Sequence, residues 1–447
     1  MKFIALLIAM AGIFPMALLI RSVPALRKNA WTVFGILPFL IPTVPQIDVA
    51  LITWDNKWVG YVYGIEVSLL DVFALSLFMT LKNRANKTNF HVPFLFYLAA
   101  IACSFINADE PIAAMFYFWQ FLKVYIVVII VSRGAFDEEI SSQLLKGLAL
   151  GLGLQFVTVI WQRWGQNIIQ PSGTFTHQNT LGLAIHFVVF PHMMLLMAGL
   201  RRLQYILVPL MGPMIAAITA SRAALAFCLL GLGMCYFVSC LRRWTQHKAR
   251  MVLIGALGVA VLAPIAFSSF QKRFEAAPLN EVEYDERAVF NRAALMIIHD
   301  SPMGVGANHY VHEAKNFGYS IRAGVVPFEG NLNNIVHNAY LLAASETGYL
   351  GATAFILVLV TPMLFAFRYG WQAKGTRLGD LLLGCGITLL VVSLHSTLEF
   401  IFFGKDIQYL FGIIVGIIYG STDRVRGLAA TAKSARLPNL EPGQRSA

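Results

Sequence analysis

Charged residues are scarce in this sequence. Asp, Glu, Lys and Arg make up 13% of its 447 residues, against about 25% in ordinary soluble domains. Hydrophobic residues reach 57%, and the mean hydropathy is +0.66. A soluble fold of this size with so few charges would have to expose large apolar patches. The composition therefore excludes an ordinary soluble protein and indicates that lipid surrounds most of the chain.

Cysteine motifs and a concentrated basic surface are also missing. The five cysteines lie in or beside apolar segments and show no CxxC spacing, which argues against a disulfide framework or a cysteine metal site. The net charge of +11 comes from Lys and Arg scattered between apolar runs. Nucleic-acid binding requires basic residues gathered on one water-facing surface, so we expect no nucleic-acid partner.

Long apolar runs dominate what is present. A helix needs about 20 residues, mostly apolar, to cross a bilayer. The runs predict spans near residues 3–20, 31–53, 63–81, 92–106, 112–132, 147–163, 181–199, 203–220, 223–241, 251–270, 338–366, 379–403 and 407–420. Pro38, Pro42 and Pro45 interrupt the second run, which leaves 12 or 13 spans open. The predicted fold is an all-α polytopic membrane protein, with one transmembrane domain over residues 1–420, since the alternation of membrane β-strands is absent.

Basic residues orient these spans. One set of alternate connections holds roughly twice as many Lys and Arg as the other, and cytoplasmic loops collect positive charge. This bias places residues 421–447 in the cytoplasm, as a basic disordered tail, and the long 271–337 loop outside. The loop sequence predicts a helix over Ala288–His299, a break at Pro302 and a turn at Gly304-Val305-Gly306. Long ordered loops are usually functional.

In this topology, three polar groups fall on the outer side. They are Gly173–Thr180 before an apolar helix, Ser221-Arg222 between two apolar helices, and the residues that open and close the long loop, Arg287, Arg292 and Val336–Tyr340. Each has an ordinary interpretation as a helix cap or a membrane-interface residue. The alternative is a lining for a sugar or diphosphate, with arginine binding phosphate. Arg287 and Arg292 lie about 140° apart around a helix, so only one should reach a central ligand.

Other polar residues in or near apolar segments have less specific interpretations. His309, His312 and Glu313 have a spacing that suits a metal, but such a set arises readily by chance, and we predict no metal site. His395 and Glu399 are spaced as a buried hydrogen-bonded pair on one helix face. Lys123 lies within a span and requires a partner or a wet cavity. His186 and His192 are expected to hydrogen-bond between helices.

Taken together, the outer motifs resemble those of one known family. Gly173-x-Phe175-x-His177-x-Asn179, Ser221-Arg222, Arg287 followed by Pro302-x-Gly304-x-Gly306, and His337-Asn338-x-Tyr340-Leu341 with Glu346-x-Gly348 resemble the O-antigen ligase and Wzy-type polymerase family. The similarity covers roughly residues 165–420. One departure is Asn291, where the family often has a Trp four residues beyond the loop arginine.

The resemblance implies a GT-C-type glycosyltransferase of the bacterial inner membrane that is inverting and needs neither a metal nor another cofactor. It implies an undecaprenyl-diphosphate-linked glycan as donor and a lipid A-core or glycan acceptor, bound on the periplasmic side. Residue by residue, it implies that Arg222 and Arg287 bind phosphate and that His337 is essential for catalysis. Further substrate-binding residues are predicted to be His177, Asn179, Arg292, Asn338 and Glu346.

These residue types suit that chemistry. Paired guanidinium groups can stabilise a departing diphosphate, and a histidine can take a proton from the attacking hydroxyl. Three alternatives stay open: a polymerase that joins repeat units, a protein O-oligosaccharyltransferase, and a transporter that binds the same lipid without chemistry. A transporter would need access from both leaflets. A channel is disfavoured because no ring of like charges is evident.

Overall fold

The computed structural model describes residues 2–40, 49–54, 57–82, 88–276 and 286–436. Most of these residues are helical. The α-helices are α1 (Lys2–Ala11), α2 (Ile13–Ser22), α3 (Pro24–Leu40), α4 (Leu69–Thr80), α5 (His91–Ser104), α6 (Pro111–Gly134), α7 (Glu138–Ile160), α8 (Gln178–Met197), α9 (Leu203–Ile218), α10 (Arg222–Arg242), α11 (Gln246–Ala276), α12 (Glu286–Asp300), α13 (Tyr310–Asn316), α14 (Tyr319–Ala323), α15 (Glu329–Leu332), α16 (Ala339–Gln372), α17 (Arg377–His395) and α18 (Lys405–Arg436). A π turn, Trp161–Gly165, extends α7, and 3-10 turns occur at Phe105–Asn107 and Ile401–Phe403.

Within the described residues, seven helices are long and apolar enough to cross a membrane. They are α6, α7 with its π turn, α8, α10, α11, α16 and α17. Four shorter apolar helices, α2, α4, α5 and α9, accompany them. The predicted fold class, an all-α polytopic membrane protein, is therefore confirmed. Each predicted span overlaps at least one helix, and the number of 12 or 13 crossings stays a prediction.

The second and third predicted spans each combine a helix with a strand. The second contains α3, which ends at Leu40, and then β1 (Val49–Thr53); its residues 41–48 lie outside the described part of the chain. The third begins with β2 (Gly64–Val67), which pairs with β1 in an antiparallel hairpin, and continues as α4. Pro42 has no backbone N–H with which to continue α3, and the β-branched residues of β1 favour a strand.

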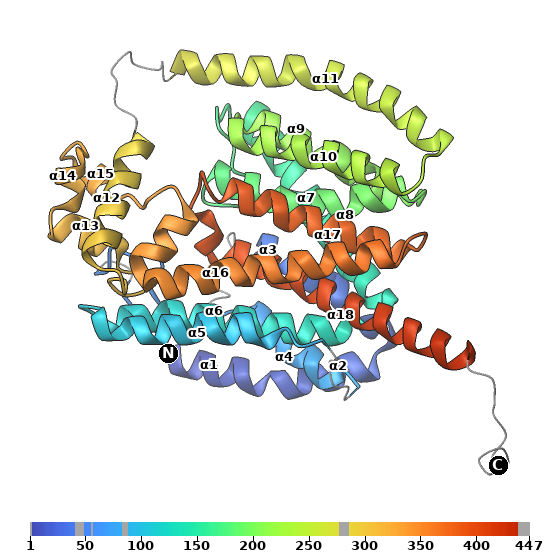
Figure 1. Ribbon diagram of the computed structural model, residues 1–447, viewed down its shortest axis with the longest axis horizontal. Helices are drawn as coiled ribbons and strands as arrows, with labels where there is room; N and C mark the ends of the chain where they lie inside the picture. Colours follow the sequence, from blue (N-terminus) through green and yellow to red (C-terminus); the bar gives the residue numbers. More distant parts are fainter. Residues whose placement is uncertain (1, 41–48, 55–56, 83–87, 277–285, 437–447) are drawn as a thin grey trace, which may run out of the picture.

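The helices pack as a bundle whose members run roughly side by side (Figure 1). Major contacts join α3 to α7, α6 to α18, and both α8 and α16 to α17. Helix α11, drawn in yellow-green at the edge of the bundle, packs mainly on α9, and only 6% of its apolar segment is buried. Most of the surface of α11 is therefore available to lipid.

The long loop forms a cluster of short helices at one end of the bundle. Helices α12 to α15 lie there, on the left of Figure 1, and α18 extends toward the other end. The predicted loop helix is α12, which ends at Asp300 shortly before Pro302. Residues 277–285 of the predicted loop lie outside the described part of the chain. The predicted tail from Ser421 is helical as far as Arg436, because α18 continues through it, and residues 437–447 are not described.

Two glycines dock the long loop onto α16. Gly304 has φ +82°, and Gly348 has φ +67° with ψ −173°, which kinks α16. Backbone N–H groups of Val305 and Gly306 donate to the carbonyl oxygens of Ser345 and Glu346, at 3.0 and 2.9 Å. A Cβ on Gly304 would lie 2.4 Å from the Glu346 carbonyl oxygen. Glycine is thus required at this contact both for its positive φ and for the absence of a side chain.

Candidate active site

The carboxylate of Glu399 is the centre of the polar cluster at the loop end of the bundle. Its side chain is only 2% exposed. Oε1 accepts hydrogen bonds from Asn179 Nδ2 at 2.7 Å and Arg287 Nη2 at 3.0 Å, and Oε2 lies 3.3 Å from His337 Nδ1. A buried carboxylate requires such compensation, since an unpaired charge is costly in a low-dielectric interior. The cluster therefore links three residues that are distant in the sequence.

The ends of four elements bring these side chains together. Asn179 is in the first turn of α8, and Arg287 is in the first turn of α12. His337 directly precedes the N-cap of α16, and Glu399 follows the end of α17. Helix termini leave backbone groups without intrahelical partners, so polar side chains accumulate there. Because the fold brings these helix ends together, their polar side chains form one site.

Arg222 lies beside the cluster, as the first residue of α10. The preceding Ser221 is the N-cap of that helix, accepting from the Ala224 N–H and donating to Asn179 Oδ1 at 3.1 Å. Asn179 thus bridges Ser221 and Glu399, which fixes the start of α10 against the carboxylate. The side chain of Arg222 is exposed. The structure therefore brings Arg222, Arg287 and His337 to one end of the bundle, around the Asn179–Glu399 link.

A third arginine enters the site from α11. Arg273 Nη1 donates to the carbonyl oxygen of Ala220 at 2.6 Å, and Ala220 itself has φ +51°. The positive charges of Arg222 and Arg287 are close enough to act electrostatically on Arg273. Like charges gathered in this way repel one another unless an anion is present. The sequence did not single out Arg273, because it lies near the end of an apolar span and has no motif around it.

Residues 206–356 match the family model described as O-antigen ligase. Over this stretch the chain is similar to O-antigen ligases. The resemblance expected from the motifs is confirmed over this stretch, which contains Arg222, Arg273, Arg287 and His337. Asn179 and Glu399 lie outside it. No curated protein matches the chain.

His177 and Asn179 lie at the start of α8, ahead of the matched stretch in the sequence. His177 is the N-cap of this helix, and its Nδ1 accepts from the Asn179 N–H at 3.2 Å, so a residue of the Gly173–Thr180 segment does cap α8. Loss of solvent around the ring lowers the pKa of His177, with the charges of His337 and Arg273 acting in the same direction and Glu399 opposing them. His177 is therefore neutral near pH 7, and its Nε2–H remains available as a donor.

The other three predicted binding residues have partners elsewhere. Arg292 donates to the carbonyl oxygen of Ala323 at 3.2 Å within the long loop. Asn338 is the N-cap of α16 and accepts from the backbone of Tyr340 and Leu341. These are the ordinary structural roles that such positions favour. Arg287 alone of the two loop arginines reaches Glu399, as their separation around the helix predicted.

Glu346 anchors the loop to the N-terminal part of the chain. Its side chain is buried, and Oε2 accepts from the Tyr61 hydroxyl at 2.5 Å and the Asn308 N–H at 2.8 Å, while Oε1 accepts from the Tyr310 N–H at 3.0 Å. Asn308 in turn bonds the backbone of Tyr61 and Val62. The acceptor positions of this carboxylate are largely used by the protein itself, which leaves little room for a ligand.

The predicted His395–Glu399 pair does not form. His395 Nδ1 lies 3.1 Å from His186 Nε2 instead, and both rings are buried. The reason is that α17 ends at His395, so Glu399 no longer follows helical spacing. His186 does bond between helices, as predicted, whereas His192 bonds the Val188 carbonyl of its own helix.

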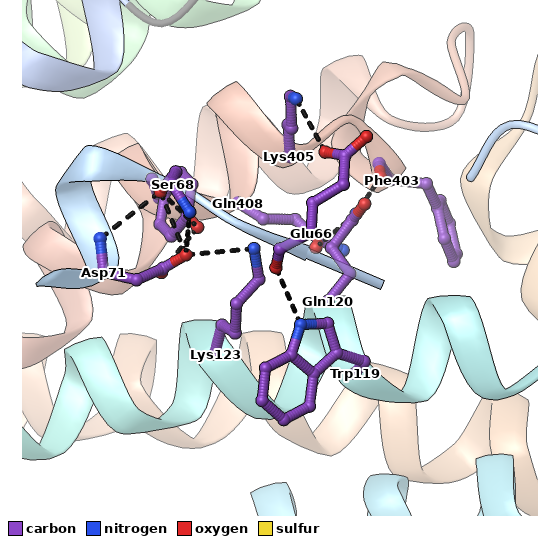
Figure 2. Close-up of polar contacts among 10 residues, drawn as sticks. Glu66, Ser68, Asp71, Trp119, Gln120, Lys123, Phe403, Lys405 and Gln408 are labelled. Carbon is purple, nitrogen blue, oxygen red and sulfur yellow. Dashed lines mark hydrogen bonds and ion pairs between the residues drawn. The ribbon is translucent and has the colours of Figure 1, made fainter. Parts of the chain in front are cut away.

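The remaining candidate residues are structural. Among the described residues, no group of three or more His, Cys, Asp or Glu could hold a metal ion. His309 stacks edge-on against Trp58, and His312 lies 3.2 Å from Asp109. Lys123 pairs with Asp71 at 3.1 Å in the network of Figure 2, where both side chains are buried between α4 and α6. A buried ion pair satisfies the requirement of Lys123 for a partner.

Proposed function

We propose that this chain is a glycosyltransferase of the O-antigen ligase and polymerase type. In this proposal it transfers a glycan from undecaprenyl diphosphate to a lipid A-core acceptor or to another glycan, on the periplasmic side of the inner membrane. The observation that carries the proposal is the Glu399 cluster. One buried carboxylate contacts both a candidate base, His337, and a candidate phosphate ligand, Arg287.

The arginines supply the positive charge that the leaving group requires. The charges of Arg222 and Arg287 both act on Arg273, so a diphosphate would relieve this repulsion as it binds. Charge-assisted hydrogen bonds from guanidinium are strong and geometrically specific for phosphate. Because the charge on the diphosphate grows as the sugar departs, these contacts strengthen in the transition state. The proposal requires no metal ion or other cofactor.

Glu399 orients His337 as the general base. The carboxylate already accepts hydrogen bonds from Asn179 and Arg287, so it acts as an acceptor toward His337 as well, and the ring proton belongs on Nδ1. The lone pair of Nε2 is then free to take a proton. A base held by a second group is the arrangement that general-base catalysis requires.

The reaction itself is a direct displacement. The acceptor hydroxyl oxygen forms a bond to the anomeric carbon, and the bond from that carbon to the diphosphate oxygen breaks. The electron pair leaves with the lipid diphosphate, and the hydroxyl proton passes to His337 Nε2. Attack from the face opposite the leaving group inverts the anomeric carbon. In this proposal, His177 Nε2–H and the second N–H of the Asn179 amide, whose first N–H donates to Glu399, hydrogen-bond sugar or phosphate oxygens beside the reacting atoms.

Release of undecaprenyl diphosphate from a lipid-linked glycan tests this proposal directly. His337→Ala in purified protein should lower the rate roughly 10²- to 10⁴-fold, the usual contribution of a general base. His299→Ala is the matched control, because His299 is 89% exposed on the loop and contacts only its neighbour Asp300. A His337→Ala protein that retains the full rate would remove the catalytic assignment.

Two further experiments separate the alternatives. Deletion of the gene should leave long unattached chains on the carrier lipid if the acceptor is lipid A-core, and single repeat units if the protein is a polymerase. Glycan that arrives on a polypeptide would identify a protein O-oligosaccharyltransferase. A transporter would move the lipid-linked glycan without releasing undecaprenyl diphosphate.

The orientation of the site has its own test. The proposal places the loop end of the bundle in the periplasm and the C-terminus in the cytoplasm, in line with the bias of Lys and Arg. Alkaline phosphatase fused at the C-terminus should then be inactive, whereas green fluorescent protein at the same point should fluoresce. The reverse result would place the Glu399 cluster in the cytoplasm.

A further inference from the structure

A polar cavity lies at the opposite end of the bundle from Glu399. Its volume is about 610 Å³, and it lies where α7, α9 and α17 begin, beside the start of α3. The Glu399 cluster lies where α9 and α17 end, so the length of these helices separates the two places. The proposed transfer reaction uses nothing in this cavity.

Basic side chains from four helices line the cavity. Lys28 comes from α3, Lys146 from α7, Arg202 from the N-cap of α9 and Arg377 from the start of α17. Arg202 Nη1 donates to Ser142 Oγ at 3.3 Å, and the other three form no ion pair with any described residue. Cations from four separate helices that converge on one cavity are suited to an anionic ligand.

The acidic residues at the rim are partly committed to other partners. Asp137 is the N-cap of α7, with Oδ1 accepting from the Glu139 N–H at 2.9 Å. Glu138 pairs with Arg424 of α18 at 2.7 Å. These two carboxylates therefore serve the start of α7 or the packing of α18, and they neutralise the cavity cations less than their number indicates. A third acidic residue, the exposed Glu139, also lines the cavity, so four basic side chains there face three acidic ones.

Buried polar atoms in the same cavity have no partner. Thr32 is 6% exposed, and its Oγ1 makes no hydrogen bond; the same holds for Gln143 Oε1 and Gln204 Nε2. A buried polar atom without a partner costs about 1–3 kcal/mol. Helix α9 adds to this, since its N-cap Arg202 gives no side-chain cap to the free N–H groups of the first turn, which attract anions. The unpartnered atoms thus include donors for phosphate oxygens and acceptors for a hydroxyl.

We propose that this cavity binds the headgroup of an anionic phospholipid that carries both a phosphodiester and a free hydroxyl, as phosphatidylglycerol does. The phosphate is held by Arg202, Arg377 and Gln204 Nε2, and the headgroup hydroxyl by Thr32 and Gln143. The acyl chains then lie along apolar side chains that neighbour lining residues in the sequence: Leu203 follows Arg202 and is 69% exposed, and Leu26 precedes Lys28 by two residues and is 42% exposed. That neighbouring apolar surface favours a lipid over free phosphate.

Binding of the full-length protein to lipid nanodiscs tests the proposal. Phosphatidylglycerol titrated into a phosphatidylcholine background should raise the melting temperature. The double variant Arg202→Ala/Arg377→Ala should weaken apparent lipid binding roughly 25-fold, at about fivefold for each cation. Arg250→Ala is the matched control, because Arg250 is an exposed arginine at the start of α11 that does not line the cavity. Equal lipid binding by the double variant and the wild type would overturn the proposal.

Two arms of the experiment separate the sources of the anion and guard against misfolding. Gln204→Leu keeps the side-chain volume and removes the unpartnered amide, so its melting temperature without lipid should be unchanged or higher, while its response to phosphatidylglycerol should fall. Inorganic phosphate and glycerol phosphate at matched concentrations should give little stabilisation. Stabilisation by either of them equal to that by the lipid would overturn the lipid assignment.

Discussion

Glu346 and Glu399 are both buried carboxylates near the loop end of the bundle, yet their surroundings differ. The partners of Glu346 are two backbone N–H groups and one tyrosine hydroxyl, all neutral. The partners of Glu399 include an arginine that is 46% exposed and a histidine that is 26% exposed. The first carboxylate is enclosed by the fold, whereas the second connects the interior to groups that face outward.

This difference distinguishes a buried carboxylate with a structural role from one that serves a functional site. A fully satisfied buried acceptor stabilises one backbone arrangement. A buried acceptor whose partners are themselves exposed and ionisable holds those partners in position for a ligand or a reaction. Both glutamates are single acidic residues among apolar ones, so the distinction depends on their neighbours in space.

The largest expected effect is that of Glu399→Gln. The amide would direct an N–H toward a site occupied by donors, so His337 would lose its orientation while the volume stays the same. The transfer rate should fall roughly 10²- to 10⁴-fold, with the melting temperature little changed. Purified protein and a lipid-linked glycan provide the assay. An unchanged rate would place Glu399 in the same structural class as Glu346.

The enclosed region should instead respond to pH through His309. The ring donates from Nδ1 to the Ala307 carbonyl and accepts at Nε2 from the Glu110 N–H, and burial lowers the pKa of His309 to about 4. Folding therefore favours the neutral ring. Its stabilising contribution is complete above about pH 6.5 and is lost as the pH falls toward 4, to a total of about 3 kcal/mol.

Hydrogen exchange of the loop backbone between pH 7 and 4, corrected for the intrinsic rate, measures this change. His309→Gln should abolish the step between pH 6.5 and 4, because the amide does not titrate. A step of the same size in that variant would assign the pH response to another group.

Glu346→Gln should lower stability more than chemistry. One of the three donors around the carboxylate would face an amide N–H, at a cost of about 1–3 kcal/mol. Thermal unfolding should shift to lower temperature, and the transfer rate per folded molecule should stay within about threefold. A selective loss of rate at an unchanged melting temperature would contradict the distinction between the two glutamates.

Arg292→Ala should have the smallest effect. Its guanidinium reaches the Ala323 carbonyl at the surface of the loop, and surface substitutions usually change free energies by no more than about 0.5 kcal/mol. The transfer rate should therefore stay within about twofold of wild type, whereas Arg287→Ala should lower it by about 10²-fold or more. Equal losses in the two variants would show that both arginines act in the site.

Much of the helical framework was accessible from the sequence, because hydrophobic runs of membrane length have few alternatives to a helix. The β1–β2 hairpin was not, since an apolar run in a membrane protein does not distinguish a strand at its end from a continuing helix. The convergence of Arg222, Arg287 and His337 followed from topology together with the family motifs. Glu399 was identified only as a partner of His395, because helical spacing was assumed past the end of α17.

The contact between Gly304 and Gly348 has a consequence for how this protein tolerates change. At this contact the loop is joined to α16 through carbonyl and N–H groups, which every residue type except proline carries, so this part of the join does not depend on particular side chains. The Glu346 carboxylate holds the next residues, Asn308 and Tyr310, beside it. Exposed positions on α12 to α15 are therefore free to vary toward a different acceptor while Arg287 keeps its distance from His337. A single methyl group at either glycine would shift the whole loop at once.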